Sequence, residues 1–116
     1  MSFINNYLTF KNNENNNEKI QGIYGIKINN KIIYIGQSKD IIERCKQHTY
    51  KIIKPIEKCK KYKNDFIPLY NELRKLFYNN YFIKFIILER INDENQLTEK
   101  ELYYINKYKP KLNVHC

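Results

Sequence analysis

The chain has 116 residues, 42% of them hydrophobic, which is enough for one domain with a single core. It contains no run of about 18 apolar residues, and its first ten residues, MSFINNYLTF, lack a cationic start, so we expect neither a membrane span nor a signal peptide. The net charge of +9 attracts polyanions, and nucleic acid is the default partner, with solubility alone as the simpler alternative. We therefore expect a cytosolic location, or the compartment that holds the nucleic acid, and no secretion.

The three cysteines, Cys45, Cys59 and Cys116, lie far apart in the sequence. Their odd number and wide spacing disfavour a disulfide framework. The sequence has no C-x-x-C pair, so a structural zinc site is not expected either. We interpret all three as reduced thiols.

Residues 1–19 are expected to form a mobile arm, because the stretch KNNENNNEK at 11–19 is polar, low in complexity and has nothing to bury. The domain proper, residues 20–116, begins with two segments rich in Ile and Tyr, 22–28 and 31–36. Asn29 and Asn30 lie between them, and Asn tolerates positive φ. The pattern predicts a β-hairpin.

A helix is predicted next, over the residues SKDIIERCKQH. Asp40 is a candidate N-cap, and Glu43 follows three residues later, as in a capping box. Residues 49–64 then carry six lysines and one proline. We expect an irregular basic loop there, with room for a helical turn.

The second half of the chain predicts a helix, a strand and a final helix. Apolar residues recur at helical spacing, with Pro68 suited to a first turn, at Phe66, Leu69, Leu73, Leu76 and Phe77. The β-branched and aromatic run at 81–89 indicates a buried strand. A last helix runs from Thr98 to about Lys107 and stops before Pro110. The order β-β-α-α-β-α predicts an α+β fold with helices packed on an antiparallel sheet.

Several short segments follow one another in a distinctive order: Gly22-Ile23-Tyr24, Tyr34-Ile35-Gly36, Arg44 with His48, Glu101 before Tyr104-Ile105, and Pro110-x-x-Asn113. Each is weak alone, but together they are specific, and the chain resembles the GIY-YIG nuclease family over nearly the whole domain. The resemblance implies a three-stranded antiparallel sheet flanked by helices. It also implies a divalent-metal-dependent endonuclease that cuts nucleic-acid phosphodiester bonds, with DNA as the favoured substrate.

The two tyrosines of these segments are candidate catalytic residues. The resemblance implies that Tyr24 contacts or deprotonates the attacking water and that Tyr34 forms a hydrogen bond within the site. A phenol, with a pKa near 10, needs positive charge nearby to act as a base. For each tyrosine, half-buried packing on a strand is the alternative. Gly22 and Gly36 would leave room for a phosphate backbone to approach.

A shared site for the two tyrosines depends on the hairpin register, because opposed residues of an antiparallel pair point to the same face. A two-residue turn at Asn29-Asn30 would pair Tyr24 with Ile35 and put Tyr34 on the other face. We therefore predict an odd-length turn over residues 28–30, which places Tyr24 opposite Tyr34, or a β-bulge with the same effect.

Arg44, His48 and Asn113 are further candidate site residues. The resemblance places Arg44 at the scissile phosphate, where a guanidinium offers a fork matched to two oxygens. His48 lies four residues later on the same helix face and can donate or accept near neutral pH. Asn113 would orient phosphate or helix neighbours. The alternatives are a solvated arginine, a structural histidine and a loop cap.

Glu101 is the candidate metal ligand, because the resemblance places a single metal-binding Glu before an aromatic-Ile pair. A carboxylate suits Mg²⁺ or Mn²⁺, and Mg²⁺ keeps most of its waters. The neighbouring Glu99 does not have the Glu-x-x-Tyr-Ile spacing. The alternative is a capping box of Thr98 with Glu101, supported by a hydrophobic staple between Leu97 and Leu102.

Lysines around and after the predicted first helix are candidate contacts to a nucleic-acid backbone: Lys39, Lys46, Lys51, Lys54, Lys58, Lys60, Lys61 and Lys63. A solvated basic loop is the alternative reading. Two rival functions also remain, a catalytically inactive nucleic-acid-binding module on the same fold and a protein-interaction domain. The complete set of polar site residues favours the enzyme.

Overall fold

The computed structural model describes residues 19–53 and 67–113 of the chain. The elements, in chain order, are β1 (Gly22–Ile28), β2 (Lys31–Ser38), α2 (Ile41–Ile53), α3 (Ile67–Tyr78), β3 (Ile83–Arg90), the 3₁₀ turn η3 (Glu94–Gln96), α4 (Leu97–Tyr108) and the 3₁₀ turn η4 (Lys111–Asn113). This order confirms the predicted β-β-α-α-β-α arrangement. The predicted arm lies, except for Lys19, outside the described residues. Of the helices in the described residues, none has the length and apolar character to cross a bilayer.

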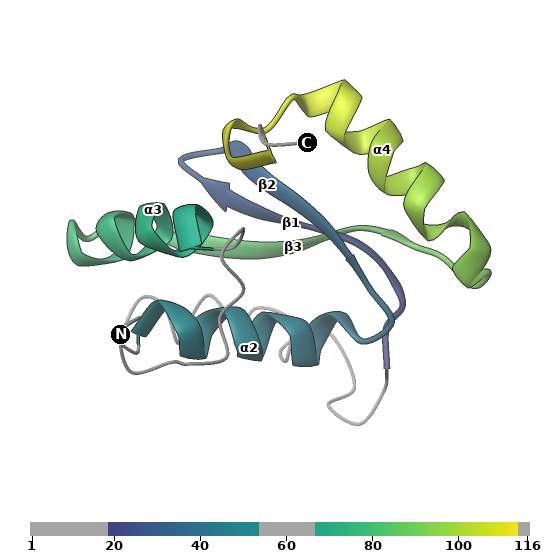
Figure 1. The fold of residues 1–116 in the computed structure, drawn as a ribbon, viewed down its shortest axis with the longest axis horizontal. Coiled ribbons are helices and arrows are strands. Elements are labelled where there is room, and N and C mark those ends of the chain that lie inside the picture. Colours follow the sequence, from purple (N-terminus) through teal and green to yellow (C-terminus); the bar gives the residue numbers. More distant parts are fainter. Residues whose placement is uncertain (1–18, 54–66, 114–116) are drawn as a thin grey trace.

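The three strands form one antiparallel sheet in the order β2-β1-β3, so β1 is central and the other two are edges. Helices α2 and α3 pack on one face, and α4 packs on the opposite face (Figure 1). Because side chains alternate along a strand, neighbouring residues of β1 contribute to two separate cores. Tyr24 packs with α2 and α3, whereas Ile23 packs with Leu97 of α4.

The hairpin turn contains two residues, Asn29 and Asn30, with φ angles of 50° and 66°. Ile28 pairs directly with Lys31 on either side of it. Two positive φ angles match the twist of the flanking strands, which explains why two asparagines suit this turn. The predicted odd-length turn is therefore wrong.

A β-bulge in β2, rather than the turn, places Tyr24 and Tyr34 on the same face of the sheet. Ile26 pairs with Tyr34 and Lys27 with Ile32, so Ile33 is an extra residue on β2. Beyond this bulge Tyr24 lies opposite Gly36. The bulge that we predicted as the second option is confirmed, and it places Tyr24 and Tyr34 on the same face of the sheet, although not directly opposite each other.

Helix α2 begins as the sequence indicates and ends later than expected. The Asp40 carboxylate accepts a hydrogen bond from the Glu43 N–H at 3.3 Å, while the Asp40 N–H donates to Ser38 Oγ at 2.9 Å. In the expected capping box the Glu43 side chain would accept from the Asp40 N–H. The structure shows Ser38 Oγ in that role instead. Residues 49–53 are helical rather than loop, because the apolar face continues to Ile52, which is fully buried. The rest of the predicted basic loop, residues 54–64, lies outside the described residues.

Helix α4 does not begin with the capping box that was the alternative explanation of Glu101. It starts at Leu97, and Thr98 already lies inside the first turn. The N-cap residue, Gln96, makes no side-chain cap hydrogen bond, and the preceding turn is capped by Asp93 instead. Leu102 is 56% exposed, so it forms no staple with Leu97. Capping therefore does not explain Glu101.

Of the three cysteines, only Cys45 lies in the described residues. It belongs to α2, forms no disulfide, and its side chain is buried in the core. Burial raises the pKa of its thiol far above the ordinary range. It packs as a small apolar side chain. Cys59 and Cys116 lie outside the described residues.

Candidate active site

Three of the predicted site residues meet on the face of the sheet that α2 covers. The rings of Tyr24 and Tyr34 lie with their centroids 6.4 Å apart, a consequence of the bulge between them and the turn. His48 reaches this pair from α2, with its ring centroid 5.7 Å from that of Tyr24 and 6.1 Å from that of Tyr34. The Tyr24 hydroxyl and His48 Nε2 are 2.7 Å apart, within hydrogen-bond distance.

A fourth residue, Tyr70 of α3, completes this cluster and was missed from the sequence. Its hydroxyl lies 2.8 Å from His48 Nδ1, so both ring nitrogens of His48 have phenol partners. The ring of Phe85 in β3 stacks on the imidazole, with an interplanar angle of 14° and a centroid distance of 6.4 Å. Tyr70 is adjacent to Leu69 in the apolar stripe of α3. Its place on the buried helix face was readable from the sequence, but its partner was not.

Burial controls the protonation of this cluster. Tyr24 is 1% exposed and His48 and Tyr70 are fully buried. Burial raises the pKa of Tyr24, with a smaller contribution from Tyr34, and the opposing charge and hydrogen bond of Arg44 do not outweigh it. Burial also lowers the pKa of His48, helped by Arg44 and Lys51. At neutral pH the phenol keeps its proton and the imidazole is uncharged.

Arg44 and Tyr34 are the half-buried members of this group, whereas Tyr24 is closed off from solvent. Arg44 lies one helical turn before His48 on α2, and its guanidinium donates to Gln47 Oε1 at 3.0 Å. A guanidinium presents five donors in a planar fork, a geometry that matches the oxygens of a phosphate. Arg44 and Tyr34 therefore form the part of the cluster that an anionic ligand would meet first.

The two glycines that flank these strands serve the packing of the sheet. A Cβ atom at Gly36 would lie 2.6 Å from the hydroxyl of Tyr24 and 2.7 Å from its Cζ. A Cβ atom at Gly22 would overlap the carbonyl oxygen of Glu89. We expected these positions to admit a phosphate backbone, but the space at each is taken by the protein itself.

Gly36→Ala is expected to displace the Tyr24 ring and to lower the free energy of unfolding by about 1–3 kcal/mol, the usual cost of overpacking a core. Gly25→Ala is the matched control. A Cβ atom there would meet side chains of Ile32 and Ile86 at 3.5 Å, which is an ordinary contact. Denaturant unfolding of both variants measures the difference. Equal stability of the two variants would contradict the tight contact between Gly36 and Tyr24.

Glu101 projects from α4 on the other face of the sheet and is half-buried. Its Oε1 accepts a hydrogen bond from Gln37 Nε2 at 2.9 Å, and the same nitrogen lies 3.3 Å from Thr98 Oγ1. Gln37 follows Gly36 on the edge strand β2. It ties the carboxylate to the strand that carries Tyr34 and packs against Tyr24. Sequence reasoning missed Gln37, although its alternation with Gly36 places it on the α4 face.

The residues around Glu101 fit a hydrated divalent ion. Across residues 19–53 and 67–113, His, Cys, Asp and Glu side chains nowhere gather in a group of three or more that could hold a metal. Mg²⁺ is commonly bound by one or two carboxylates and keeps several waters. A single carboxylate oriented by the Gln37 amide, whose own oxygen is a further hard donor, suits that requirement.

Asn113, in η4, is buried beside the same edge strand. Its Oδ1 accepts from the N–H of Ile35 at 2.9 Å, and its Nδ2 donates to the carbonyl of Ile35 at 3.0 Å. The side chain thus satisfies the open edge of β2 between Tyr34 and Gly36. Its predicted contact with a phosphate stays a prediction.

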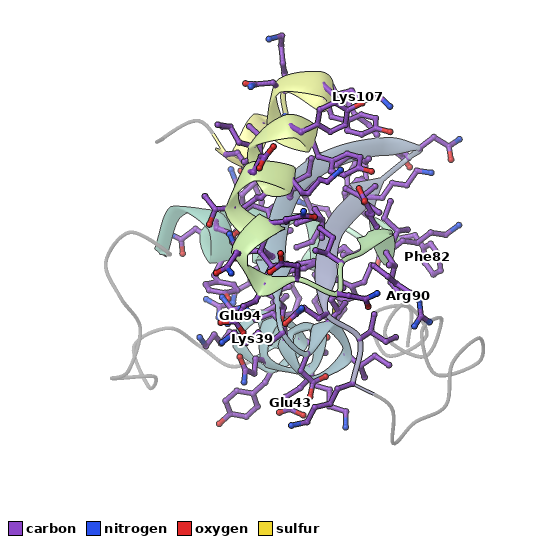
Figure 2. The ribbon with its side chains drawn as sticks, turned by 90° about the vertical axis from the view of Figure 1, so that its right-hand side faces the viewer. Lys39, Glu43, Phe82, Arg90, Glu94 and Lys107 are labelled. Atoms are coloured by element: carbon purple, nitrogen blue, oxygen red, sulfur yellow. The ribbon has the colours of Figure 1, made fainter. Side chains whose placement is uncertain are left out.

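Only some of the predicted nucleic-acid-binding lysines lie in the described residues. Lys39 pairs with Glu94 at 3.2 Å on the exposed surface, and Figure 2 shows the two side by side. Lys46 is exposed on α2, and the Nζ of Lys51 lies 5.6 Å from the centroid of the Tyr70 ring. The remainder, Lys54, Lys58, Lys60, Lys61 and Lys63, lie outside the described residues.

Comparison with solved structures finds chains of similar fold. The chain is similar to the N-terminal GIY-YIG endonuclease domain of UvrC from Thermotoga maritima, described with magnesium as its catalytic divalent cation. The identity is 21%, over 83% of this chain and 85% of that one, with a TM-score of 0.47. It is also similar to a mutant of bacteriophage T4 EndoII, at 18% identity, over 81% and 73% of the two chains, with a TM-score of 0.55. The EndoII likeness supports the fold alone. A search of curated protein sequences found no significant match.

The family model for the GIY-YIG catalytic domain matches residues 20–113. This range holds every element of the sheet, the helices on both of its faces and all the predicted site residues. The chain therefore belongs to the GIY-YIG family of endonuclease catalytic domains.

Proposed function

We propose that this chain hydrolyses phosphodiester bonds of DNA with a divalent metal ion held at Glu101. The observation that carries the proposal is the hydrogen bond from Gln37 to Glu101, at 2.9 Å. It joins the α4 carboxylate to the strand whose other face packs on the cluster of Tyr24, Tyr34, Arg44 and His48. The net charge of +9 supports a polyanionic substrate.

Arg44 is proposed to bind the scissile phosphate. Its guanidinium carries a permanent charge and a planar fork that matches two phosphate oxygens. It is half-buried, so its field is screened less than that of a surface lysine. Tyr34, equally half-buried beside it, can donate a hydrogen bond to the same group.

Glu101 and Gln37 would hold the metal ion. When bound, Mg²⁺ or Mn²⁺ supplies Lewis-acid stabilisation of the charge that develops on the phosphate and its leaving oxygen. Gln37 keeps the Glu101 carboxylate in one orientation through Oε1. Positioning of this kind accounts for much of the catalysis in phosphoryl chemistry.

Tyr24 and His48, which are more deeply buried than Arg44 and Tyr34, would transfer a proton between them. The pKa of Tyr24 is raised by burial, so this phenol is not a ready-made phenolate base. A proton that leaves Tyr24 has the neutral His48 Nε2 at 2.7 Å to receive it. The catalytic role of Tyr24 thus depends on its contact with His48.

Metal-dependent cleavage is the direct test. We expect the protein to nick or cut supercoiled plasmid in the presence of Mg²⁺ or Mn²⁺, and excess chelator to abolish the reaction. Cleavage that continues undiminished in chelator would rule the metal out. Binding without cleavage of duplex, branched and single-stranded DNA and of RNA would favour the inactive nucleic-acid-binding module instead.

A further inference from the structure

The imidazole of His48 lies between two phenols, each contributed by a different element. We propose that Tyr70 is a positioning residue that fixes His48 in one tautomer, with the proton on Nδ1 donated to Tyr70 and Nε2 left to accept from Tyr24. This inference deepens the proposed function, on which its effect on activity rests. The tautomer itself can be tested without any activity.

The geometry around His48 leaves the ring little freedom. Its Nδ1 lies 2.8 Å from the Tyr70 hydroxyl and its Nε2 lies 2.7 Å from the Tyr24 hydroxyl. Phe85 stacks on one face, and Tyr34 meets the ring edge-on at 74°. All of these contacts except that of Tyr34 involve residues with no more than 1% exposure.

Helix α3, which carries Tyr70, is itself fixed to the end of α2. The Arg74 side chain donates from Nε to the carbonyl of Ile52 at 2.9 Å and from a terminal nitrogen to the carbonyl of Lys51 at 2.7 Å. These bonds satisfy carbonyls of the last turn of α2, which lack partners within the helix. Tyr70, one helical turn before Arg74, is thereby held at a set distance from His48.

The proton assignment follows from what each neighbour can donate. The Arg44 guanidinium lowers the pKa of Tyr24, and because arginine only donates, it favours an arrangement in which the Tyr24 oxygen accepts from it. The Tyr24 hydroxyl proton is then directed at its other partner, His48 Nε2, which must be unprotonated to accept it. A neutral imidazole carries one N–H, so that proton is on Nδ1 and faces Tyr70.

The opposite tautomer is less well satisfied. With the proton on Nε2, the Tyr24 oxygen would accept from both His48 and Arg44, and its own hydroxyl proton would need another acceptor within a buried site. An unsatisfied buried donor is costly, on the order of 1–3 kcal/mol. With the proton on Nδ1, the Tyr24 hydroxyl proton and both nitrogens of His48 have partners already in contact, and the remaining hydroxyl proton is that of Tyr70, which has an interaction besides the one with His48. This arrangement also leaves Nε2 as the atom that can take a proton from Tyr24.

Nitrogen-15 NMR of the wild-type protein tests the tautomer directly. Long-range correlations between the ring protons and nitrogens distinguish Nδ1–H from Nε2–H. A His115→Asn variant assigns the spectrum, because His48 and His115 are the two histidines of the chain. We expect a single Nδ1–H form for His48 at neutral pH. A protonated Nε2 in the wild-type protein would overturn the inference.

Tyr70→Phe tests the role of the phenol while keeping the ring. We expect the two His48 tautomers to mix and kcat to fall about ten- to a hundredfold, by analogy with the range seen when partners that orient metal-bound histidines are removed, with KM unchanged. Tyr104→Phe is the matched control, because it also loses a phenol hydrogen bond, to Glu89 at 2.9 Å, and should leave the His48 spectrum unaltered. Thermal unfolding of both variants confirms that each is folded.

A Tyr70→Phe variant with an unaltered His48 tautomer and wild-type kcat would also overturn the inference. If Tyr70→Phe does not fold, the wild-type spectrum still decides the tautomer. If the wild-type protein cuts no nucleic acid, the proposed function fails, and the wild-type spectrum again decides the inference independently.

Discussion

Glu101→Gln is expected to lower the rate of DNA cleavage by about a thousandfold or more while leaving folding and DNA binding nearly intact. If Glu101 is the carboxylate ligand of the metal, as proposed, its loss would remove several kcal/mol of transition-state stabilisation, and each 1.4 kcal/mol is about a factor of ten in rate. The substituted amide oxygen can still accept the hydrogen bond from Gln37, so the local packing is retained. Single-turnover cleavage, gel-shift binding and thermal unfolding measure the three quantities.

Glu99→Gln provides the control for this experiment. Glu99 lies on the same helix, is exposed, and undergoes the same change of charge. Its activity should stay within about twofold of wild type, because exposed substitutions of this kind have small effects. If Glu101→Gln instead destabilises the fold and retains cleavage, then Glu101 serves the structure and the metal is held elsewhere.

Arg44→Ala is expected to reduce cleavage by about a hundred- to a thousandfold and to weaken binding of the substrate as well. The variant would lose a permanent charge at the proposed phosphate site and the favourable interaction of Arg44 with Tyr24. Arg44→Lys should recover little of this activity, because an ammonium lacks the planar fork that engages two oxygens. Cleavage rates and dissociation constants, measured at one fixed salt concentration, separate the two effects.

Arg90→Ala is the matched control for bulk charge. Arg90 ends β3, the edge strand on the opposite side of β1 from β2, and Figure 2 shows it at the surface. The Arg90→Ala substitution removes the same unit charge as Arg44→Ala and leaves the cluster around His48 unchanged. Full activity in Arg44→Lys, or an equal loss in Arg90→Ala, would mean that Arg44 contributes charge alone.

The element order of this protein is encoded locally, and the sequence therefore predicted it well. Helical spacing placed α3, the side chain of Asp40 placed the start of α2, and paired asparagines placed the hairpin turn. Where the local signals misled, tertiary contacts had replaced them. Burial of Ile52 extended α2 beyond its expected end, and α4 begins directly after a 3₁₀ turn, which leaves Thr98 inside the helix rather than at its N-cap.

The candidate site was only partly predictable for the same reason. The sequence by itself determined which residue types the site contains, because the short segments around Tyr24, Tyr34, Arg44 and Glu101 can be read one at a time. Tertiary structure alone decided how they meet. The extra residue Ile33 in β2 sets the faces of the tyrosines, since a shift of one residue moves a side chain to the opposite side of a sheet.

The contacts to Tyr70 and Gln37 likewise exist only in the folded chain. Tyr70 is 22 residues from His48, and Gln37 is 64 residues from Glu101. A hydrogen bond over such a separation leaves no periodicity in the sequence, because it depends on how two elements pack rather than on how either one forms. The sequence thus determined the elements and the chemistry they carry, and the packing of α3 and α4 on opposite faces of the sheet decided which of these groups touch.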